Sequence, residues 1–382
     1  MAARPTHEWP DDDELVRLVS AHPTNEAAAD ALGVNSRTLA SHLGKQGLRD
    51  RVRQGRVRGL EAVAEPEDAD AVFDQDVRQH IGRKKRIAVE DLADALDVAP
   101  RKVRDSLERL RIAGYRIPEP TDGHVELQKV VPDKLNLHKS LLTGTELQIG
   151  LVSDTHLSSN EQALAELELA YDVFAERGIT EVLHAGDWTC GAGIFKTQAA
   201  EIFNHTFESQ VDYLAEHYPH RPGIVTRGIS GNHDIEGDFG RIGANPVVAL
   251  ANRRDDIEFL GDYSAWVELP NGAWLHLLHG KGGMSYAYSY KAQKLVDSYP
   301  SGRKPAVLAC GHWHVSGNIE ARGVHVVWPA CFEWKGKFLE RLGLNPSVGF
   351  HILHMTLGED GSLVRFMPEF FRFWEGRVMV AA

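Results

Sequence analysis

From about residue 146 onward, the chain alternates short apolar runs with longer runs in which apolar residues recur at helical spacing. The short runs have the length of buried strands, and the longer ones predict amphipathic helices that cover a sheet. The alternation therefore predicts an α/β fold. The expected strands are Leu147–Val152, Glu181–His184, Gly223–Ile229, Ala265–Leu269, Trp274–Leu278, Ala306–Ala309, Val324–Val327 and Gly349–Thr356, and the expected helices between the first three are Glu161–Arg177 and Ile202–Tyr218.

The N-terminal third has a different pattern, with helical spacing only. Three short helices are expected at Glu14–Ala21, Asn25–Leu32 and Ser36–Leu43, with Gly33 and Val34 in the turn between the second and the third, and this is the pattern of a helix-turn-helix. Their shared core would consist of small and branched apolar residues: Ala28, Leu32, Val34, Leu39 and Leu43.

A second helical trio follows an alanine-rich, acidic stretch. Its helices are expected at Phe73–Ile81, Val89–Leu96 and Arg101–Ala113, and short strands at Tyr115–Ile117 and Val125–Leu127 would form a wing. This unit resembles a winged helix-turn-helix. The expected domains are a helix-turn-helix domain at 1–60, a linker at 61–76, a winged helix-turn-helix domain at 77–135 and the α/β domain at 146–382.

Charge and composition exclude several classes of protein and kinds of metal site. The net charge of −12 argues against a wholly basic nucleic-acid coat protein, and three cysteines without a CxxC pair argue against a disulfide framework or a thiolate zinc site. No apolar stretch predicts a signal peptide or a membrane span, so we expect a cytoplasmic protein with no membrane partner.

Basic residues are concentrated in the two helical units. They would contact DNA phosphates or bases at Arg37, Lys45, Arg101, Lys102 and Arg104. The alternatives are that these residues form solvated basic faces or that the units dock on another protein, because helix-turn-helix units serve both purposes.

Five short motifs stand where strand-like runs end. They are Asp154-Thr155-His156, Gly186-Asp187, Gly231-Asn232-His233-Asp234, His279-Gly280 and Gly311-His312-Trp313-His314. Side chains two apart in an extended backbone point the same way, so the DxH and HxH pairs can each hold one ion. Oxygen and nitrogen ligands without thiolate suit hard or borderline divalent metals.

The ordered set of motifs, over about residues 147 to 357, resembles the calcineurin-like dinuclear metallophosphoesterase superfamily. The resemblance implies a two-sheet sandwich flanked by helices, here preceded by the two small all-α domains. It also implies two divalent ions that activate a shared water as hydroxide. Manganese is the expected metal, with iron, zinc, nickel and cobalt as alternatives.

The resemblance also implies the role of each motif residue. The first metal would be held by Asp154, His156, Asp187 and His314, and the second by Asp187, Asn232, His279 and His312. His233 would stay free of metal and stabilise the transition state or protonate the leaving oxygen, and Asp234 would orient it.

The segment after His279 carries lysines and tyrosines that can bind substrate. Lys281 would contact phosphate, and Tyr286 and Tyr290 would stack on bases. The alternative is a helix start with aromatic residues in the core. The whole sequence thus predicts a DNA-processing phosphodiesterase or nuclease. The alternative is a DNA-binding regulator whose phosphoesterase domain hydrolyses a small nucleotide or acts as a sensor.

Overall fold

The computed structural model describes residues 9–20, 69–84, 86–126, 136–300, 303–374 and 377–380, together with residues 28, 29, 31, 32, 34, 38, 39, 42, 43, 46, 48 and 52. The chain divides into two compact units, Met1–Gln75 and Asp76–Ala382. Among these described residues, no helix combines the length and the apolar composition that a membrane crossing requires.

The N-terminal unit contains helix α1, Asp12–Ser20, which begins two residues before the predicted start. Leu15 and Val19 of this helix pack in one core with Ala28, Leu39 and Leu43, and Leu32 and Val34 lie against that core. The predicted small core is therefore confirmed. The bounds of the second and third predicted helices, and with them Arg37 and Lys45, lie outside the described residues.

The second helical trio is present where the pattern predicts it. Helix α5 spans Ala69–Lys84, α6 spans Val89–Ala95 and α7 spans Pro100–Ile112. Proline at the first position of α7 fits a helix start, because its missing N–H has no partner there in any helix. Helix α5 begins inside the predicted linker, since alanine favours helix and Asp70 lies in the first turn.

The predicted wing is wrong in one strand. Strand β1, Arg86–Ala88, pairs antiparallel with β2, His124–Glu126. Tyr115 instead forms a bridge with Ala244 of the α/β domain, and the Arg116 N–H donates to the carbonyl of Gly243. Gly114 ends α7 at φ +92, and a Cβ there would lie 2.7 Å from the carbonyl oxygen of Asn245. The close backbone approach explains why this segment leaves the wing.

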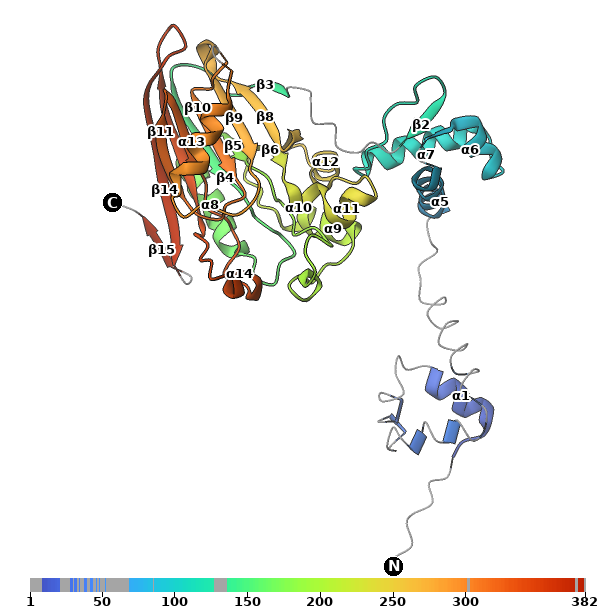
Figure 1. Cartoon of the computed structure of the whole chain (residues 1–382). Coiled ribbons are helices and arrows are strands. Elements are labelled where there is room, and N and C mark those ends of the chain that lie inside the picture. Colours follow the sequence, from blue (N-terminus) through green and yellow to red (C-terminus); the bar gives the residue numbers. More distant parts are fainter. Residues whose placement is uncertain are drawn as a thin grey trace, which may run out of the picture. The chain divides into compact units, whose positions relative to one another are not determined.

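Two sheets form the α/β domain, as predicted, and they lie face to face (Figure 1). The six-stranded sheet has the order β11-β12-β10-β9-β8-β3 and the seven-stranded sheet the order β15-β14-β13-β4-β5-β6-β7. The strands are β3 Leu137–Lys139, β4 Glu146–Val152, β5 Glu181–His184, β6 Val225–Ser230, β7 Ile257–Asp262, β8 Ser264–Glu268, β9 Trp274–His279, β10 Val307–Gly311, β11 Gly317–Ala321, β12 Val324–Trp328, β13 Gly349–Leu357, β14 Leu363–Trp374 and β15 Arg377–Val380.

Helices flank the two sheets (Figure 1). They are α8 Leu164–Glu176, α9 Phe207–His217, α10 Asn232–Ile235, α11 Gly237–Arg241, α12 Pro246–Ala251, α13 Ser289–Ser298 and α14 Lys337–Leu342, with 3-10 turns at Gln198–Ala200 and Pro270–Gly272. Helices α9 to α12 gather beside β6 (Figure 1). Side chains of α8 pack on the seven-stranded sheet and those of α13 on the six-stranded one.

A core of branched apolar side chains fills the space between the sheets. Ile149 and Leu151 of β4 meet Leu275 and Leu277 of β9 in this core, and all four are fully buried. At about 1.5–3 kcal/mol for each buried side chain, this interior is the main stabilising element of the sandwich. Strand β3 belongs to the six-stranded sheet, where it pairs with β8, although it precedes the predicted start of the domain at 146.

Candidate metal centre

All five motifs lie where strands end at their carboxyl sides. Strands β4, β5 and β6 are parallel neighbours in one sheet, and β9 and β10 are parallel neighbours in the other. The loops that follow parallel strands meet at one edge of a sheet. Residues up to 160 positions apart in sequence are brought together there, from Asp154 to His314.

Five of the seven predicted ligands have left-handed backbone conformations, which non-glycine residues rarely adopt. Their φ values lie between 43° and 87°. Such strain costs about 1–3 kcal/mol for each residue and accumulates at functional sites, where the surrounding structure imposes it. The strained residues are Asp154, His156, Asp187, His312 and His314.

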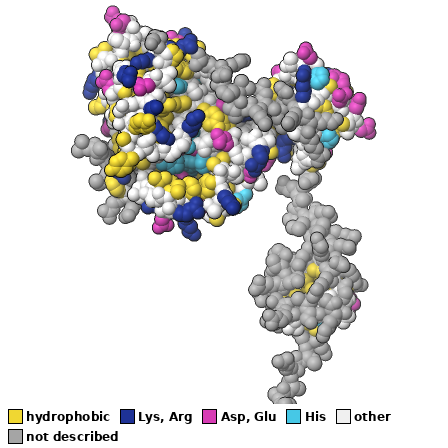
Figure 2. Space-filling model, in the orientation of Figure 1, with side chains coloured by type: hydrophobic (Ala, Val, Ile, Leu, Met, Phe, Trp, Pro, Cys, Tyr) yellow, Lys and Arg dark blue, Asp and Glu magenta, His cyan; other side chains and the backbone are white. Residues whose placement is uncertain are grey.

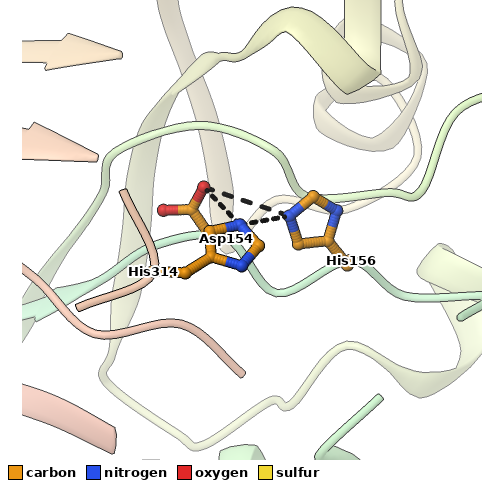
Figure 3. Close-up of side chains that lie close together, drawn as sticks. All are labelled: Asp154, His156 and His314. Atoms are coloured by element: carbon orange, nitrogen blue, oxygen red, sulfur yellow. Dashed lines mark hydrogen bonds and ion pairs between the residues drawn. The ribbon is translucent and has the colours of Figure 1, made fainter. Parts of the chain in front are cut away.

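The first cluster consists of Asp154, His156 and His314, whose ligand atoms point at one another (Figure 3). The Nε2 atoms of the two histidines are 3.0 Å apart, and Asp154 Oδ1 lies 3.4 Å from His314 Nε2 and 4.0 Å from His156 Nε2. Two imidazole nitrogens that face each other at this distance share at most one proton. Lone pairs that converge in this way match the donor set of a divalent cation.

The second cluster consists of Asp187, His279 and His312, with Asn232 beside them. Three atoms surround His279 Nε2: Asp187 Oδ2 at 3.2 Å, Asn232 Oδ1 at 3.1 Å and His312 Nδ1 at 3.2 Å. The other nitrogen of His279 lies 2.8 Å from the Ala185 carbonyl, which can only accept. Nδ1 of His279 therefore carries a proton, and its Nε2 is directed at the cluster.

Asp187 lies between the two clusters. Its Oδ2 is 3.8 Å from His156 Nε2 and 3.2 Å from His279 Nε2. Its Oδ1 accepts the backbone N–H of His233 at 2.8 Å. One carboxylate is thus placed where it can contact ions in both clusters.

The buried surroundings set the protonation of these groups. Burial, and then the His233 and His314 rings, lower the pKa of His156 well below its usual value, and burial and the His279 ring lower the pKa of His312 to about 4. Burial raises the pKa of Asp187, but the His279 and His233 rings outweigh it and hold that pKa well below its usual value. Burial lowers the pKa of His279 and His314, but Asp187 outweighs it and raises the pKa of His279 to about 9, and Cys331 and Asp154 raise that of His314. Neutral imidazole and ionised carboxylate are the forms that bind metals, so His156, His312 and Asp187 are already in those forms.

The ring of His233 lies 4.6 Å from that of His156, and a ligand atom of His233 lies within 4.8 Å of ligand atoms of His156 and Asp187. Its Nδ1 contacts the Cys190 carbonyl at 2.7 Å. The predicted orientation of His233 by Asp234 is wrong. The Asp234 carboxylate instead accepts the backbone N–H groups of Gly231, Trp188 and Thr189, and it ties the GNHD loop to the GD loop. A buried carboxylate satisfies nearby backbone donors first, because an unpaired buried N–H is costly.

The residues predicted to bind substrate lie outside the buried clusters. Lys281, Tyr286 and Tyr290 are all exposed. A helix does begin here, at Ser289, but its tyrosines do not enter the core.

The basic residues of α7 predicted to contact DNA are exposed as well. Arg104 pairs with Glu90 at 3.2 Å, and Arg101 pairs with Asp105 at 4.0 Å. Lys102 lies between the two arginines in the sequence.

Glu333 also lies at the centre, although no motif indicated it. Its carboxylate accepts the Ser159 hydroxyl at 2.6 Å, and Ser159 follows His156 by three residues. Burial raises the pKa of Glu333 while His314 and His233 lower it, so the carboxylate is within electrostatic reach of both rings. In the sequence Glu333 is a single acidic residue between two aromatic residues, Phe332 and Trp334, and it belongs to no motif.

The chain was compared with known proteins. It is similar in structure to an archaeal phosphodiesterase (18% identity, 58% of this chain and 99% of that one, TM-score 0.32) and to the Vps29 of Entamoeba histolytica complexed with zinc (14%, 61% and 96%, TM-score 0.34). It is also similar to Vacuolar Protein Sorting 29 of Cryptosporidium parvum (14%, 62% and 97%, TM-score 0.35). No curated protein matches it. The family model described as "Calcineurin-like phosphoesterase superfamily domain" matches residues 147–337, half of the chain. Together with its five motifs, this match shows that the chain belongs to the calcineurin-like phosphoesterase superfamily.

Proposed function

We propose that this protein is a phosphodiesterase that uses two divalent metal ions and acts on nucleic acid. The observation that carries the proposal is the pair of clusters, in each of which carboxylate oxygen and imidazole nitrogen atoms converge within 4.8 Å, with Asp187 between them. A phosphodiester needs this kind of site because its charge must be neutralised while water attacks.

In this proposal the seven predicted ligands keep their assignments. Asp154, His156, Asp187 and His314 hold one ion, and Asp187, Asn232, His279 and His312 hold the other. When bound, such ions supply a nucleophile at neutral pH and stabilise charge on the phosphoryl oxygens. Manganese is the proposed metal, and iron, zinc, nickel or cobalt suit the same oxygen and nitrogen donors.

His233 is the proposed general acid. The Cys190 carbonyl can only accept a hydrogen bond, so Nδ1 of His233 carries a proton and Nε2 is left for the reacting groups. In its cationic form the ring carries a second proton, on Nε2. His233 would then donate its Nε2 proton to the leaving oxygen.

Asp234 and Glu333 act at a distance from the reacting atoms. Asp234 positions the loop of His233 through three backbone N–H groups, and so it keeps Asp187 and His233 in register. Glu333 lies within electrostatic reach of the rings of His314 and His233, and it accepts the Ser159 hydroxyl from the loop that carries His156.

A nuclease acting on DNA is supported by the presence of basic helical units in the same chain as the metal centre. Arg101, Lys102 and Arg104 lie exposed on α7, the helix that would read a groove. One observation favours the second candidate, a small-nucleotide phosphodiesterase with a regulatory helical unit. Acidic side chains pair with Arg101 and Arg104, which reduces the positive charge available for DNA phosphates.

The test is a metal-dependent activity screen on bis-p-nitrophenyl phosphate, single- and double-stranded DNA and cyclic nucleotides. Wild type is compared with His233→Ala and Asp187→Ala, and with His124→Ala, a matched control at an exposed histidine of β2. We expect the two site variants to lose about a hundredfold or more in turnover and the control to lose none. Equal turnover in all four proteins would refute the site assignment. Hydrolysis of cyclic nucleotides but not of DNA would favour the second candidate.

A further inference from the structure

The segment Gly280–Tyr290, here called the tyrosine loop, comprises the connection from β9 to α13 and the first two residues of that helix, and it displays aromatic side chains to solvent. Tyr286 is fully exposed, and Tyr288 and Tyr290 are 55% and 54% exposed. These are three of the five large exposed aromatic side chains among the described residues. A cluster of exposed aromatic rings in one loop marks a binding surface more often than scattered ones do.

The tyrosine loop is fixed at two points, so the exposure of its rings is built into the fold. Met284 is partly buried against the core under α13, and Lys291 of that helix donates to the carbonyls of Lys281 and Gly282 at 3.2 and 3.0 Å. Gly282 has φ +67, a turn conformation that suits glycine. The anchors hold the loop ends on the protein while the tyrosines point away from the core.

Basic residues outnumber acidic ones in the sequence around these tyrosines. Residues 280–304 contain five basic residues and one acidic residue, in a chain whose net charge is −12. The acid, Asp297, already pairs with Arg322 at 2.7 Å. The Lys294 ammonium lies 5.7 Å from the centre of the Tyr290 ring. Aromatic rings within a basic surface are complementary to unpaired bases on a phosphate backbone.

The tyrosine loop begins at the metal centre. Lys281 follows the cluster residue His279 by two positions, so their Cα atoms are at most about 7 Å apart. Gly280 packs beside Trp313, the residue between His312 and His314, and a Cβ at Gly280 would lie 3.4 Å from that indole. In Figure 2 a strip of histidine side chains lies in a hollow, with hydrophobic side chains on both sides and Lys and Arg around it.

We propose that the tyrosine loop binds unpaired bases of a single-stranded nucleic acid whose phosphodiester lies at the metal centre. Tyr286, Tyr288 and Tyr290 stack on successive bases, and Lys281 contacts a phosphate. This rests on the proposed function and narrows its substrate to single strands or single-stranded ends. In a duplex each base is already stacked between its neighbours and has no free face for a tyrosine.

The test measures binding of a labelled oligothymidylate to the full chain by fluorescence anisotropy, with chelator present to prevent cleavage. Stacking on one ring contributes enough that Tyr286→Ala or Tyr290→Ala should weaken binding at least about fivefold. Tyr286→Phe keeps the ring and should bind as wild type does. Trp374→Ala removes an exposed ring from β14 and is the matched control, with no expected change. Because Tyr286 is fully exposed, its replacement should not disturb folding.

Two further readings complete the test. Lys281→Ala should reduce the slope of log affinity against log salt by about 0.7, the value for one phosphate contact on a single strand. Binding to a duplex of the same length should not respond to the tyrosine variants. Equal oligothymidylate affinity in wild type and both tyrosine variants would overturn the proposal. The same result is expected if the rings bind a protein partner instead.

Failure of the proposed function can be recognised separately. Wild type is assayed in parallel on bis-p-nitrophenyl phosphate with manganese, a substrate that needs no base contact. If wild type does not hydrolyse bis-p-nitrophenyl phosphate, the phosphodiesterase assignment is refuted. The anisotropy result would still decide whether the tyrosine loop binds single strands.

Discussion

Replacement of Asp234 by alanine tests whether this carboxylate acts by joining two loops or by acting on His233 in another way. If it ties the GNHD loop to the GD loop, the change removes the acceptor of three buried backbone N–H groups, on Gly231 at 2.8 Å, Thr189 at 3.0 Å and Trp188 at 3.2 Å. Each unpaired buried donor costs about 1–3 kcal/mol, so the unfolding free energy should fall by at least about 3 kcal/mol. For a domain of this size that corresponds to a melting temperature about 6 °C lower or more.

Thermal unfolding of chelator-treated protein, followed by circular dichroism, measures this difference without contributions from bound metal. The matched control is His233→Ala, which removes a partly exposed ring, its hydrogen bond to the Cys190 carbonyl, worth about 1 kcal/mol, and its edge contact with the His156 ring. A melting temperature of Asp234→Ala equal to that of wild type, together with loss of turnover, would refute the reasoning. Asp234 would then act through His233 in another way.

Three further predictions concern other parts of the domain. A methyl group at position 231 would lie 2.2 Å from Asp187 Oδ1, so Gly231→Ala should displace that carboxylate and lower turnover of metal-loaded enzyme about 100-fold, whereas unchanged kcat would contradict the close packing. Arg227→Ala removes the cation that contacts the fully buried Glu181 at 2.7 Å and should lower the unfolding free energy in urea by about 3–5 kcal/mol; a loss below about 1 kcal/mol would argue against this ion pair. Burial lowers the pKa of His276 to about 4 from 6.5, so the unfolded chain binds the extra proton and stability is lost as the pH falls through this range. The unfolding free energy is measured by urea titration of metal-free protein at a series of pH values. As the pH falls, His276→Gln should lose up to about 3 kcal/mol less than wild type, and an identical pH dependence of the two proteins would refute the assignment.

The sandwich could be predicted from its sequence because its central strands are rich in apolar residues and long enough to show a pattern. Strand β3 has only three residues, and it is held at the edge by pairing with β8 and by Arg227, which donates to the Lys139 carbonyl. Such a strand depends on contacts far along the chain. The sequence did not predict the pairing of β1 with β2 for a similar reason. Tyr115, which was expected in the wing, forms a bridge with Ala244, a residue far along the chain.

The candidate centre could be located because each motif follows a strand and all those strand ends meet. The sequence therefore indicated the residues that form the two clusters, although their role as ligands stays a prediction. It could not indicate the partners of Asp234, because Trp188 and Thr189 reach it only when two loops fold together. Nor could it decide whether Tyr286 is buried or exposed, since a tyrosine next to a helix start suits both.

Metal stoichiometry tests the central claim most directly. Chelated protein is dialysed to equilibrium against manganese, and the metal bound to each chain is measured in wild type, His156→Ala, His279→Ala and the control His124→Ala. We predict two ions for wild type and the control, and about one for each cluster variant, because His156 lies with Asp154 and His314 while His279 lies with Asp187 and His312. A wild-type chain that binds fewer than two ions, or cluster variants that still bind two, would contradict the dinuclear centre.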